Sequence, residues 1–195
     1  MPRNLDIFRI KTNNVLPQKG RILIAEPFLS GSYFNRSIVY LTEHNQNGAV
    51  GFILNKPVDF PVLEFKKEFP NFADSIYLGG PVNIESMYYI HTLGEHIPGS
   101  ILIKDNLYWG GDYDHLKDLI NSGFVSKGQV RFFLGYSGWD KEQLKEELKE
   151  DSWLVADIPA KMVMEDNKQL WKDMVKKQGG IYSLWENFPK NPSMN

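Results

Sequence analysis

Short apolar runs alternate with polar and glycine-rich segments along the whole chain, and most of these runs are too short for helices. Runs rich in β-branched and aromatic residues, bounded by Gly, Pro or Asn, are typical of strands. We therefore expect strands over residues 21–27, 36–45, 49–55, 75–78, 86–91, 100–103, 107–109 and 129–134.

Four segments carry the apolar spacing of helices instead, namely residues 59–69, 112–123, 137–151 and 166–180. Asp112 precedes the second segment as a preferred N-cap residue, and Gly123 ends it. Asp166, three residues before Gln169, is the corresponding start signal of the last segment.

Many short strands with helices between them predict an α+β fold and not a regular βαβ series. We expect a single domain over residues 1–195, with a mixed, largely antiparallel sheet of short strands flanked by helices. Closure of the sheet into a barrel-like form is the alternative. Residues 1–19 are expected to be an N-terminal extension, and residues 189–195 a disordered tail.

The strongest local signal is the stretch EHNQNGAVGFILNKP, residues 43–57. Its Asn47-Gly48 pair predicts a two-residue hairpin turn. With these two residues in the turn, His44 lies opposite Gly51 and Tyr40 opposite Asn55. One face of this hairpin would then be entirely apolar and belong to the core, and the other would be mixed.

The polar ends of this hairpin allow two interpretations. In the first, Glu43, His44 and Asn45 close the strand end by bonding to loop backbone, and Pro57 ends the strand pairing. In the second, His44 lines a small-ligand pocket whose floor is Gly51. Asn55 would lie roughly 13 Å from His44 along the strand, so the two ends cannot reach one atom.

The other candidate catalytic, metal-binding and nucleotide-binding motifs fit their known patterns poorly. Ser137 lies between a strand and a helix, as in a nucleophile elbow, but Gly138 follows it at once, where that motif needs glycine two residues later. Ser137 fits a helix N-cap instead. His91 and His96 lack a third ligand at suitable spacing, and no nucleotide-binding motif is present. We expect no metal and no cofactor.

Composition narrows the classes of function. The chain has no cysteine, which excludes thiolate catalysis and disulfides, and 22 basic residues stand against 24 acidic ones. Because nucleic-acid binders normally carry a positive surface stripe, direct nucleic-acid binding is not expected. The start of the chain does not resemble a signal peptide, and no apolar run is long enough to span a membrane. We expect a cytoplasmic protein without membrane association.

Several motifs, in their order and spacing, resemble the YqgE/AlgH family of bacterial proteins. They are GRILIAEPFL, RSIVYLTEHNQNGAVGFILNKP, YLGGPV, FFLGYSGWDKEQLKEEL and the following Trp153. The resemblance covers about residues 20 to 185. It implies a cytosolic α+β domain with a mixed sheet flanked by helices, and no agreed activity or catalytic residues. One branch of the family has been described as a transcriptional regulator of alginate synthesis.

Within these matching motifs we expect any ligand-binding residues. The candidates are Glu43, His44, Asn45, Gly51, Asn55, Lys56, Ser137 and Trp139.

The leading hypothesis is a non-enzymatic binding or regulatory protein that acts through a small ligand or a protein partner. The alternative is a hydrolase or transferase that uses His44 or His91 with Ser137 or Glu43. Such an enzyme requires those groups within about 3 Å of one another, directly or through a water molecule. A transcriptional regulator that binds DNA directly is the third hypothesis, although no helix-turn-helix spacing is found.

Overall fold

The structure is a computed structural model that describes residues 11–59 and 62–189. The first ten residues and the expected tail beyond residue 189 lie outside this part. Within it, nine strands form one sheet in the order β6-β7-β5-β8-β3-β2-β1-β9, and β4 pairs with β8 beside this path. The strands are β1 (Arg21–Ala25), β2 (Ile38–Asn45), β3 (Gly48–Ile53), β4 (Ile76–Leu78), β5 (Val82–His91), β6 (Ile101–Lys104), β7 (Leu107–Trp109), β8 (Val130–Asp140) and β9 (Trp153–Asp157).

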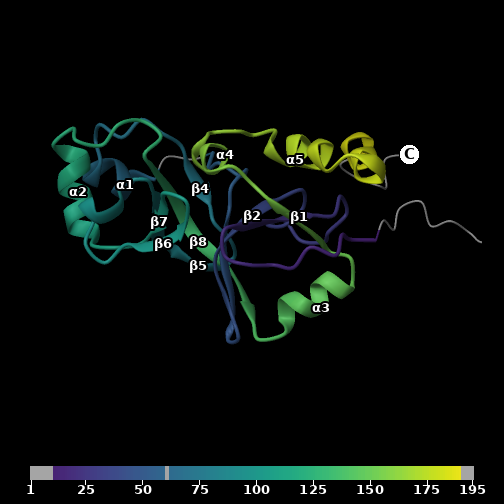
Figure 1. Ribbon diagram of the computed structural model, residues 1–195. Coiled ribbons are helices and arrows are strands. Elements are labelled where there is room, and N and C mark those ends of the chain that lie inside the picture. Colours follow the sequence, from purple (N-terminus) through teal and green to yellow (C-terminus); the bar gives the residue numbers. More distant parts are fainter. Residues whose placement is uncertain (1–10, 60–61, 190–195) are drawn as a thin grey trace, which may run out of the picture.

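Helices cover both faces of this sheet. They are α1 (Leu63–Glu68), α2 (Tyr113–Asn121), α3 (Gln143–Lys149), α4 (Ala160–Met164), α5 (Leu170–Gln178) and the 3-10 helices η1 (Gly94–His96) and η2 (Gly180–Asn187). Figure 1 shows α4 and α5 above the strands, α3 below them, and α1 and α2 together at one end. The α+β prediction, with a largely antiparallel sheet flanked by helices, is therefore confirmed; β4 and β8 form the one parallel pair among the described strands.

The sheet is open, so the barrel-like alternative is wrong. Its two end strands, β6 and β9, share no backbone pairing in the described chain, although side chains bridge them. Lys104 Nζ of β6 lies 3.2 Å from Asp157 Oδ1 of β9, and Lys19 Nζ donates to Leu102 O over 3.0 Å. A Cβ atom on Gly20 would lie 2.8 Å from Lys104 Cβ. The chain entering β1 thus lies against β6.

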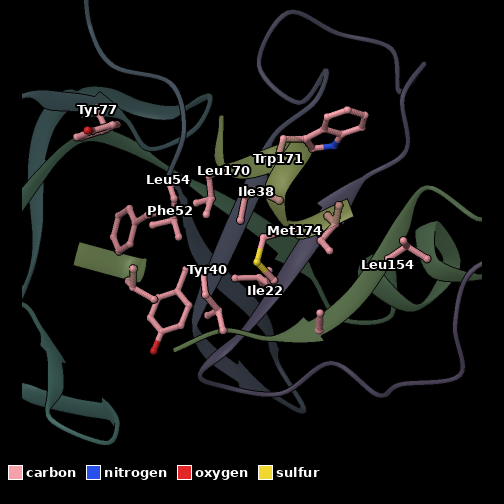
Figure 2. Packing of buried hydrophobic residues seen from close by; sticks show 14 of the residues in the cluster. Ile22, Ile38, Tyr40, Phe52, Leu54, Tyr77, Leu154, Leu170, Trp171 and Met174 are labelled. Carbon is pink, nitrogen blue, oxygen red and sulfur yellow. The ribbon is translucent and has the colours of Figure 1, made fainter. Parts of the chain in front are cut away.

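The inner face of the curved sheet holds the largest core cluster. Strands from both ends of the sheet contribute to it, including Leu154 of β9 and Ile103 of β6. Figure 2 shows Met174 of α5 beside Ile22 of β1, with Tyr40 of β2 and Phe52 of β3 nearby. Trp171 of α5 belongs to the same cluster. Full burial of one such side chain contributes about 1.5–3 kcal/mol, so α5 is held mainly by its apolar face.

The outer face carries two further clusters. One joins Val39, Leu41 and Ile53 to Leu144 of α3 and to two buried tryptophans. The other packs α1 and α2 against β5 and β8 around Phe132. The prediction of one apolar and one mixed face is wrong for the body of the β2–β3 hairpin, where both faces are apolar and buried. The inner face holds Ile38, Tyr40, Phe52 and Leu54, and the outer face holds Val39, Leu41 and Ile53. A strand between two helical layers is apolar on both sides.

The remaining differences from the sequence predictions lie in the second half of the chain. The predicted helix over residues 137–151 begins only at Gln143, because Ser137 to Asp140 extend β8 and pair with β3. Tertiary pairing overrides the local capping signal here. The last predicted helix begins at Leu170 and not at Asp166, and β9, α4 and η2 were not predicted.

Glycines allow a close crossing of two chain segments at the middle of β8. A Cβ atom on Gly79 would lie 2.2 Å from Gly135 O, and one on Gly135 would lie 2.7 Å from both Gly80 O and Val82 O. Gly135 also has φ +66°, in the left-handed region that glycine enters at little cost. The YLGGPV motif is thus a crossing of backbone over backbone, which takes the chain from β4 into β5.

Candidate functional site

The turn of the β2–β3 hairpin is shifted by one residue from its predicted place. Gln46 and Asn47 form the turn, because Asn45 pairs with Gly48 and His44 with Ala49. A bulge at Thr42 then places Gly51 opposite Leu41. The predicted pairing of His44 with Gly51 is therefore wrong, and the Asn-Gly signal misplaced the turn because Gly48 still takes part in the strand ladder.

Gly51 does not form the floor of a pocket. A Cβ atom there would lie 2.6 Å from Tyr40 O and 2.8 Å from Val39 Cγ1, so the neighbouring strand fills the space beside it. The absent side chain serves close strand packing and leaves no room for a ligand.

His44 and Asn45 instead line an open groove at the hairpin tip, which we call the hairpin groove. It encloses about 750 Å³ between the tip, the segment 11–17 and helix α3. Asn45 Oδ1 accepts the Asn47 backbone N–H over 2.8 Å and so closes the turn, as in the first interpretation of the sequence. His44 is exposed, and Glu43, one residue before it, is half-buried.

Ser137 and Trp139 face the protein interior. Ser137 is fully buried, and its hydroxyl donates to Gly79 O over 3.0 Å at the glycine crossing. Trp139 Nε1 donates to Glu147 Oε2 over 2.8 Å, and Trp153 Nε1 donates to the same oxygen over 2.7 Å. These contacts fix α3 against the sheet, so the motif that contains both residues is structural at these positions.

Ser137 and His91, one pair of the enzyme hypothesis, do not converge. Ser137 pairs with Gly51, whereas His91 pairs with Val130, seven residues earlier on β8 (137 − 130) and roughly 23 Å away along the strand. His91 is fully buried, and its ring nitrogens contact Leu93 N and Gly110 O. Burial lowers the pKa of His91 in spite of the bond to Gly110.

Asn55 and Lys56 follow β3 and hold the loop before β2. The Asn55 side chain accepts the Ile38 N–H and donates to Arg36 O, each over 2.9 Å, so it replaces a pair of strand hydrogen bonds. Lys56 Nζ donates to Ser32 O over 2.7 Å. Asn55 is thus committed to the fold, and both residues border a separate depression of about 560 Å³.

A third hollow was not predicted from the sequence. It is a cleft of about 630 Å³ between β4, the start of β8 and α4, and we call it the Asp166 cleft. Its lining includes Asp74, Ser75, Tyr77, Thr92, Asn106, Lys127, Val130, Arg131, Ala160, Lys161, Met164, Glu165 and Asp166.

The carboxylate of Asp166 is exposed in this cleft and is held by two hydroxyls. Tyr77 Oη donates to Oδ1 over 2.5 Å, and Ser75 Oγ donates to Oδ2 over 3.2 Å. Burial, and next the hydrogen bond to Asp166, raise the pKa of Tyr77 to about 12. The phenol therefore remains a proton donor at neutral pH and keeps the carboxylate oriented.

Arg131 fixes the Tyr77 ring from behind. Its guanidinium carbon lies 3.8 Å from the ring centroid, and the side chain is 3% exposed. Its Nη atoms donate to the carbonyls of Leu54, Val163 and Glu165. Burial lowers the pKa of Arg131, and the nearby Tyr77 and Asp166 act in the opposite direction and raise it. The cleft thus has a second layer of contacts that joins β3, β8 and the end of α4.

The sequence contained one signal for this cleft, but it was misread. Asp166 lies three residues before Gln169, which resembles a capping box, yet its carboxylate bonds to β4 and the segment before it. Asn167 closes a turn before the helix, since its Oδ1 accepts the Gln169 N–H over 2.8 Å, and the N-cap residue Gln169 makes no side-chain capping bond. Nothing in the spacing of Ser75, Tyr77 and Arg131 indicates that they meet Asp166.

The described residues lack two further features. They contain no group of three or more His, Asp or Glu side chains that could hold a metal ion. None of the described helices combines the length and apolar character that a membrane span requires.

The fold, the hairpin motif and the glycine crossing define a class of α+β proteins with an open, strongly curved sheet. The profile of the AlgH-like family, DUF179, matches residues 22–183. The chain belongs to this family.

Its curated relatives include the UPF0301 protein BF2109 of Bacteroides fragilis, 44% identical over 194 residues, which cover 98% of each chain. A UPF0301 protein of Parabacteroides distasonis is 47% identical over 193 residues, 97% of this chain and 98% of the relative. The solution structure of AlgH from Pseudomonas aeruginosa matches with a TM-score of 0.69 and 25% identity, over 92% of this chain and 98% of that one. Protein DIP2367 from Corynebacterium diphtheriae shares the fold, with a TM-score of 0.71 and 23% identity over 92% and 95% of the two chains.

Proposed function

We propose that the protein is a cytosolic, non-enzymatic binding protein that recognises a small ligand in the Asp166 cleft and acts as a regulator through the bound ligand. The observation that carries this proposal is the exposed Asp166 carboxylate, oriented by two hydroxyls in a cleft of ligand size. Small-molecule sites usually occupy hollows of about 300–1,000 Å³ with a few fixed polar groups.

The charges of the cleft select the kind of ligand. Three acidic and three basic side chains line it, and these are Asp74, Glu165, Asp166, Lys127, Arg131 and Lys161. Their formal charges cancel, so a neutral or zwitterionic ligand fits better than a highly charged one. A carboxylate offers about four acceptor positions, and two on Asp166 are occupied by protein hydroxyls. We therefore expect a ligand that donates hydrogen bonds from hydroxyl or ammonium groups.

The second layer of contacts also supports a binding role. Because Arg131 fixes Tyr77, and Tyr77 fixes Asp166, the carboxylate has its bound orientation before a ligand arrives. A preorganised group costs less ordering entropy on binding than a mobile one. In the alternative interpretation, the two hydrogen bonds of Asp166 serve only to connect the segment before α5 to β4.

A non-enzymatic role is supported by the separation of Ser137 from the two histidines that the sequence analysis named as its partners. Ser137 is buried and bonded to Gly79, His91 is buried near β7, and His44 lies at the exposed hairpin tip. Turnover of a substrate that is abolished by His44→Ala would contradict this part of the proposal.

The test is a thermal-shift screen of the full chain against amino acids, sugars, polyols and nucleosides, with Asp166→Asn and His44→Ala alongside. A ligand at 100 times its Kd stabilises the fold by about 2.7 kcal/mol. For a chain of this length that is a rise in Tm of roughly 5–10 °C. Asparagine keeps the size of the side chain and one acceptor oxygen, so Asp166→Asn should fold while losing the charge that orients the ligand.

The two variants distinguish the two hollows. A ligand whose shift is lost in Asp166→Asn and kept in His44→Ala supports the Asp166 cleft. The reverse pattern would move the site to the hairpin groove, where the sequence placed its candidate. If no compound shifts the wild-type Tm, the small-ligand proposal is wrong for the classes screened, and a protein partner becomes the leading hypothesis.

Direct DNA binding is not part of the proposal. Helix α3 carries Lys and Glu side chains in pairs, with 2.6 Å between the charged atoms of Glu142 and Lys145 and of Glu146 and Lys149. Paired charges leave little free positive charge for phosphates. A gel-shift assay at low salt should therefore show no complex, and a complex with a steep salt dependence would overturn this expectation.

A further inference from the structure

Two of the three carboxylates in the lining of the Asp166 cleft have a cation beside them. Asp74 Oδ1 lies 3.9 Å from Lys127 Nζ, and Glu165 Oε1 lies 3.6 Å from Lys161 Nζ. All four side chains belong to the lining. Both lysines of the cleft are therefore paired within the protein.

Asp166 is the exception. It forms no ion pair within the described part of the chain, and its hydrogen bonds come from the neutral hydroxyls of Ser75 and Tyr77. The third cation of the cleft, Arg131, is buried against the Tyr77 ring, and its Nη atoms donate to backbone carbonyls. The Asp166 carboxylate is thus fixed in place and exposed, without a cation in contact with it.

A charged donor completes this carboxylate better than a third neutral one. A carboxylate offers about four acceptor positions, and the two hydroxyls use two of them. A hydrogen bond between an ammonium group and a carboxylate is roughly twice as strong as one between neutral groups. An ammonium group on the ligand therefore supplies the charge that the protein leaves out at Asp166.

The rest of the cleft then favours an anionic group on the same ligand. Once an ammonium group compensates Asp166, the remaining charged side chains of the lining are three cations and two carboxylates, so one positive charge is in excess. A ligand carboxylate balances that charge. Val130, Ala160 and Met164 give the lining an apolar part, and apolar walls with a few fixed polar groups are usual in ligand sites.

We propose that the ligand of the Asp166 cleft is a free α-amino acid with an aliphatic side chain. This inference rests on the proposed function and names its class of ligand. The ammonium group donates to the Asp166 carboxylate, the aliphatic side chain packs against the apolar part of the lining, and the ligand carboxylate balances the excess positive charge.

The test is an NMR titration of the labelled full chain with L-leucine and three compounds of matched shape. Leucic acid has a hydroxyl in place of the ammonium group, 4-methylpentanoate has a hydrogen there, and isoamylamine lacks the carboxylate. L-Leucine should perturb amides at residues 74–77, 127–131 and 160–166, around the cleft. The Kd of each other compound should be at least about tenfold higher, because each lacks one of the two charges that the cleft balances.

Variants assign the preference for an ammonium group to one carboxylate. Asp166→Asn should raise the Kd of L-leucine at least about tenfold and leave that of leucic acid nearly unchanged. Asp118→Asn, at an exposed position on α2, is the matched control and should change neither Kd. An amide spectrum of Asp166→Asn that matches the wild type outside the cleft shows that the variant is folded.

The outcomes separate this inference from the proposed function. Leucic acid that binds as tightly as L-leucine overturns the ammonium group, and isoamylamine that binds as tightly overturns the carboxylate. L-Leucine that leaves the cleft amides unperturbed at millimolar concentration overturns the amino-acid ligand. The proposed function still stands in these cases if another compound of the thermal-shift screen perturbs the same amides, and it fails too if none does.

Discussion

Gly135 allows the sharpest test of how the chain builds this fold. We consider Gly135→Ala, which adds one methyl group where β8 passes under the YLGGPV segment. Two costs follow from the structure. An L-residue at φ +66° loses about 1–2 kcal/mol relative to glycine. The added Cβ would also lie 2.7 Å from the carbonyl oxygens of Gly80 and Val82, and overpacking of this kind costs about 1–3 kcal/mol.

The sum predicts a loss of about 2–5 kcal/mol from the free energy of unfolding, out of a total of about 5–15 kcal/mol. Urea unfolding followed by tryptophan fluorescence measures it. With a slope of about 1–3 kcal/mol per molar urea, the midpoint should fall by about 1 M or more.

Gly110→Ala is the matched control. Gly110 has φ +65°, nearly the same as Gly135, but a Cβ atom there would have nothing within 4 Å. It should therefore lose only the conformational part, about 1–2 kcal/mol. The difference between the two variants isolates the packing cost at the crossing. Equal losses in both variants would refute the interpretation of the crossing as a close backbone contact.

Three further predictions concern His91, Glu147 and Asp112. Burial lowers the pKa of His91 below its ordinary 6.5, so the unfolded chain binds the proton first as the pH falls. The unfolding free energy should therefore decline from about pH 6.5 downward, by at most about 1.4 kcal/mol per pH unit. Urea unfolding at pH 7 and pH 5 should show a smaller difference in unfolding free energy for His91→Gln than for the wild-type protein. Glu147→Leu leaves the buried N–H groups of Trp139 and Trp153 without their acceptor and should cost about 2–5 kcal/mol in urea unfolding, clearly more than Glu147→Gln, which keeps one acceptor oxygen. Asp112→Ala removes the side-chain bond to the His115 N–H at the start of α2 and should lower the unfolding free energy by about 1 kcal/mol, whereas an unchanged midpoint would deny the cap any role.

The sequence predicted the elements that depend on local pattern. The strands β1, β2 and β3 and helix α2 occur where their apolar runs and capping residues placed them, and the Asp112 cap is confirmed. The prediction of a helix at residues 137–140 was wrong, because their strand conformation comes from pairing with β3 and a local sequence pattern does not contain that pairing. The predicted register of the hairpin was wrong by one residue for a related reason. The bulge at Thr42 and the ladder position of Gly48 depend on the neighbouring strands.

The candidate sites show the same division. Three of the candidates named from the sequence border hollows, because a polar cluster at a strand end is visible in the chain. His44 and Asn45 border the hairpin groove, and Lys56 borders the depression after β3. It missed the Asp166 cleft, whose polar groups come from segments up to 91 residues apart and meet only through the fold. The sequence placed Arg131 on a strand but gave no sign of what its side chain does. Its guanidinium binds three backbone carbonyls and supports the ring of Tyr77.

Ligand binding in the Asp166 cleft is tested most directly by solution NMR of the labelled full chain. Amide spectra recorded with and without a compound that raises the Tm would locate its binding site. The proposed function predicts that the perturbed amides cluster at residues 74–77, 127–131 and 160–166, around the cleft. Perturbations confined to residues 44–49 and helix α3 would contradict it and assign binding to the hairpin groove.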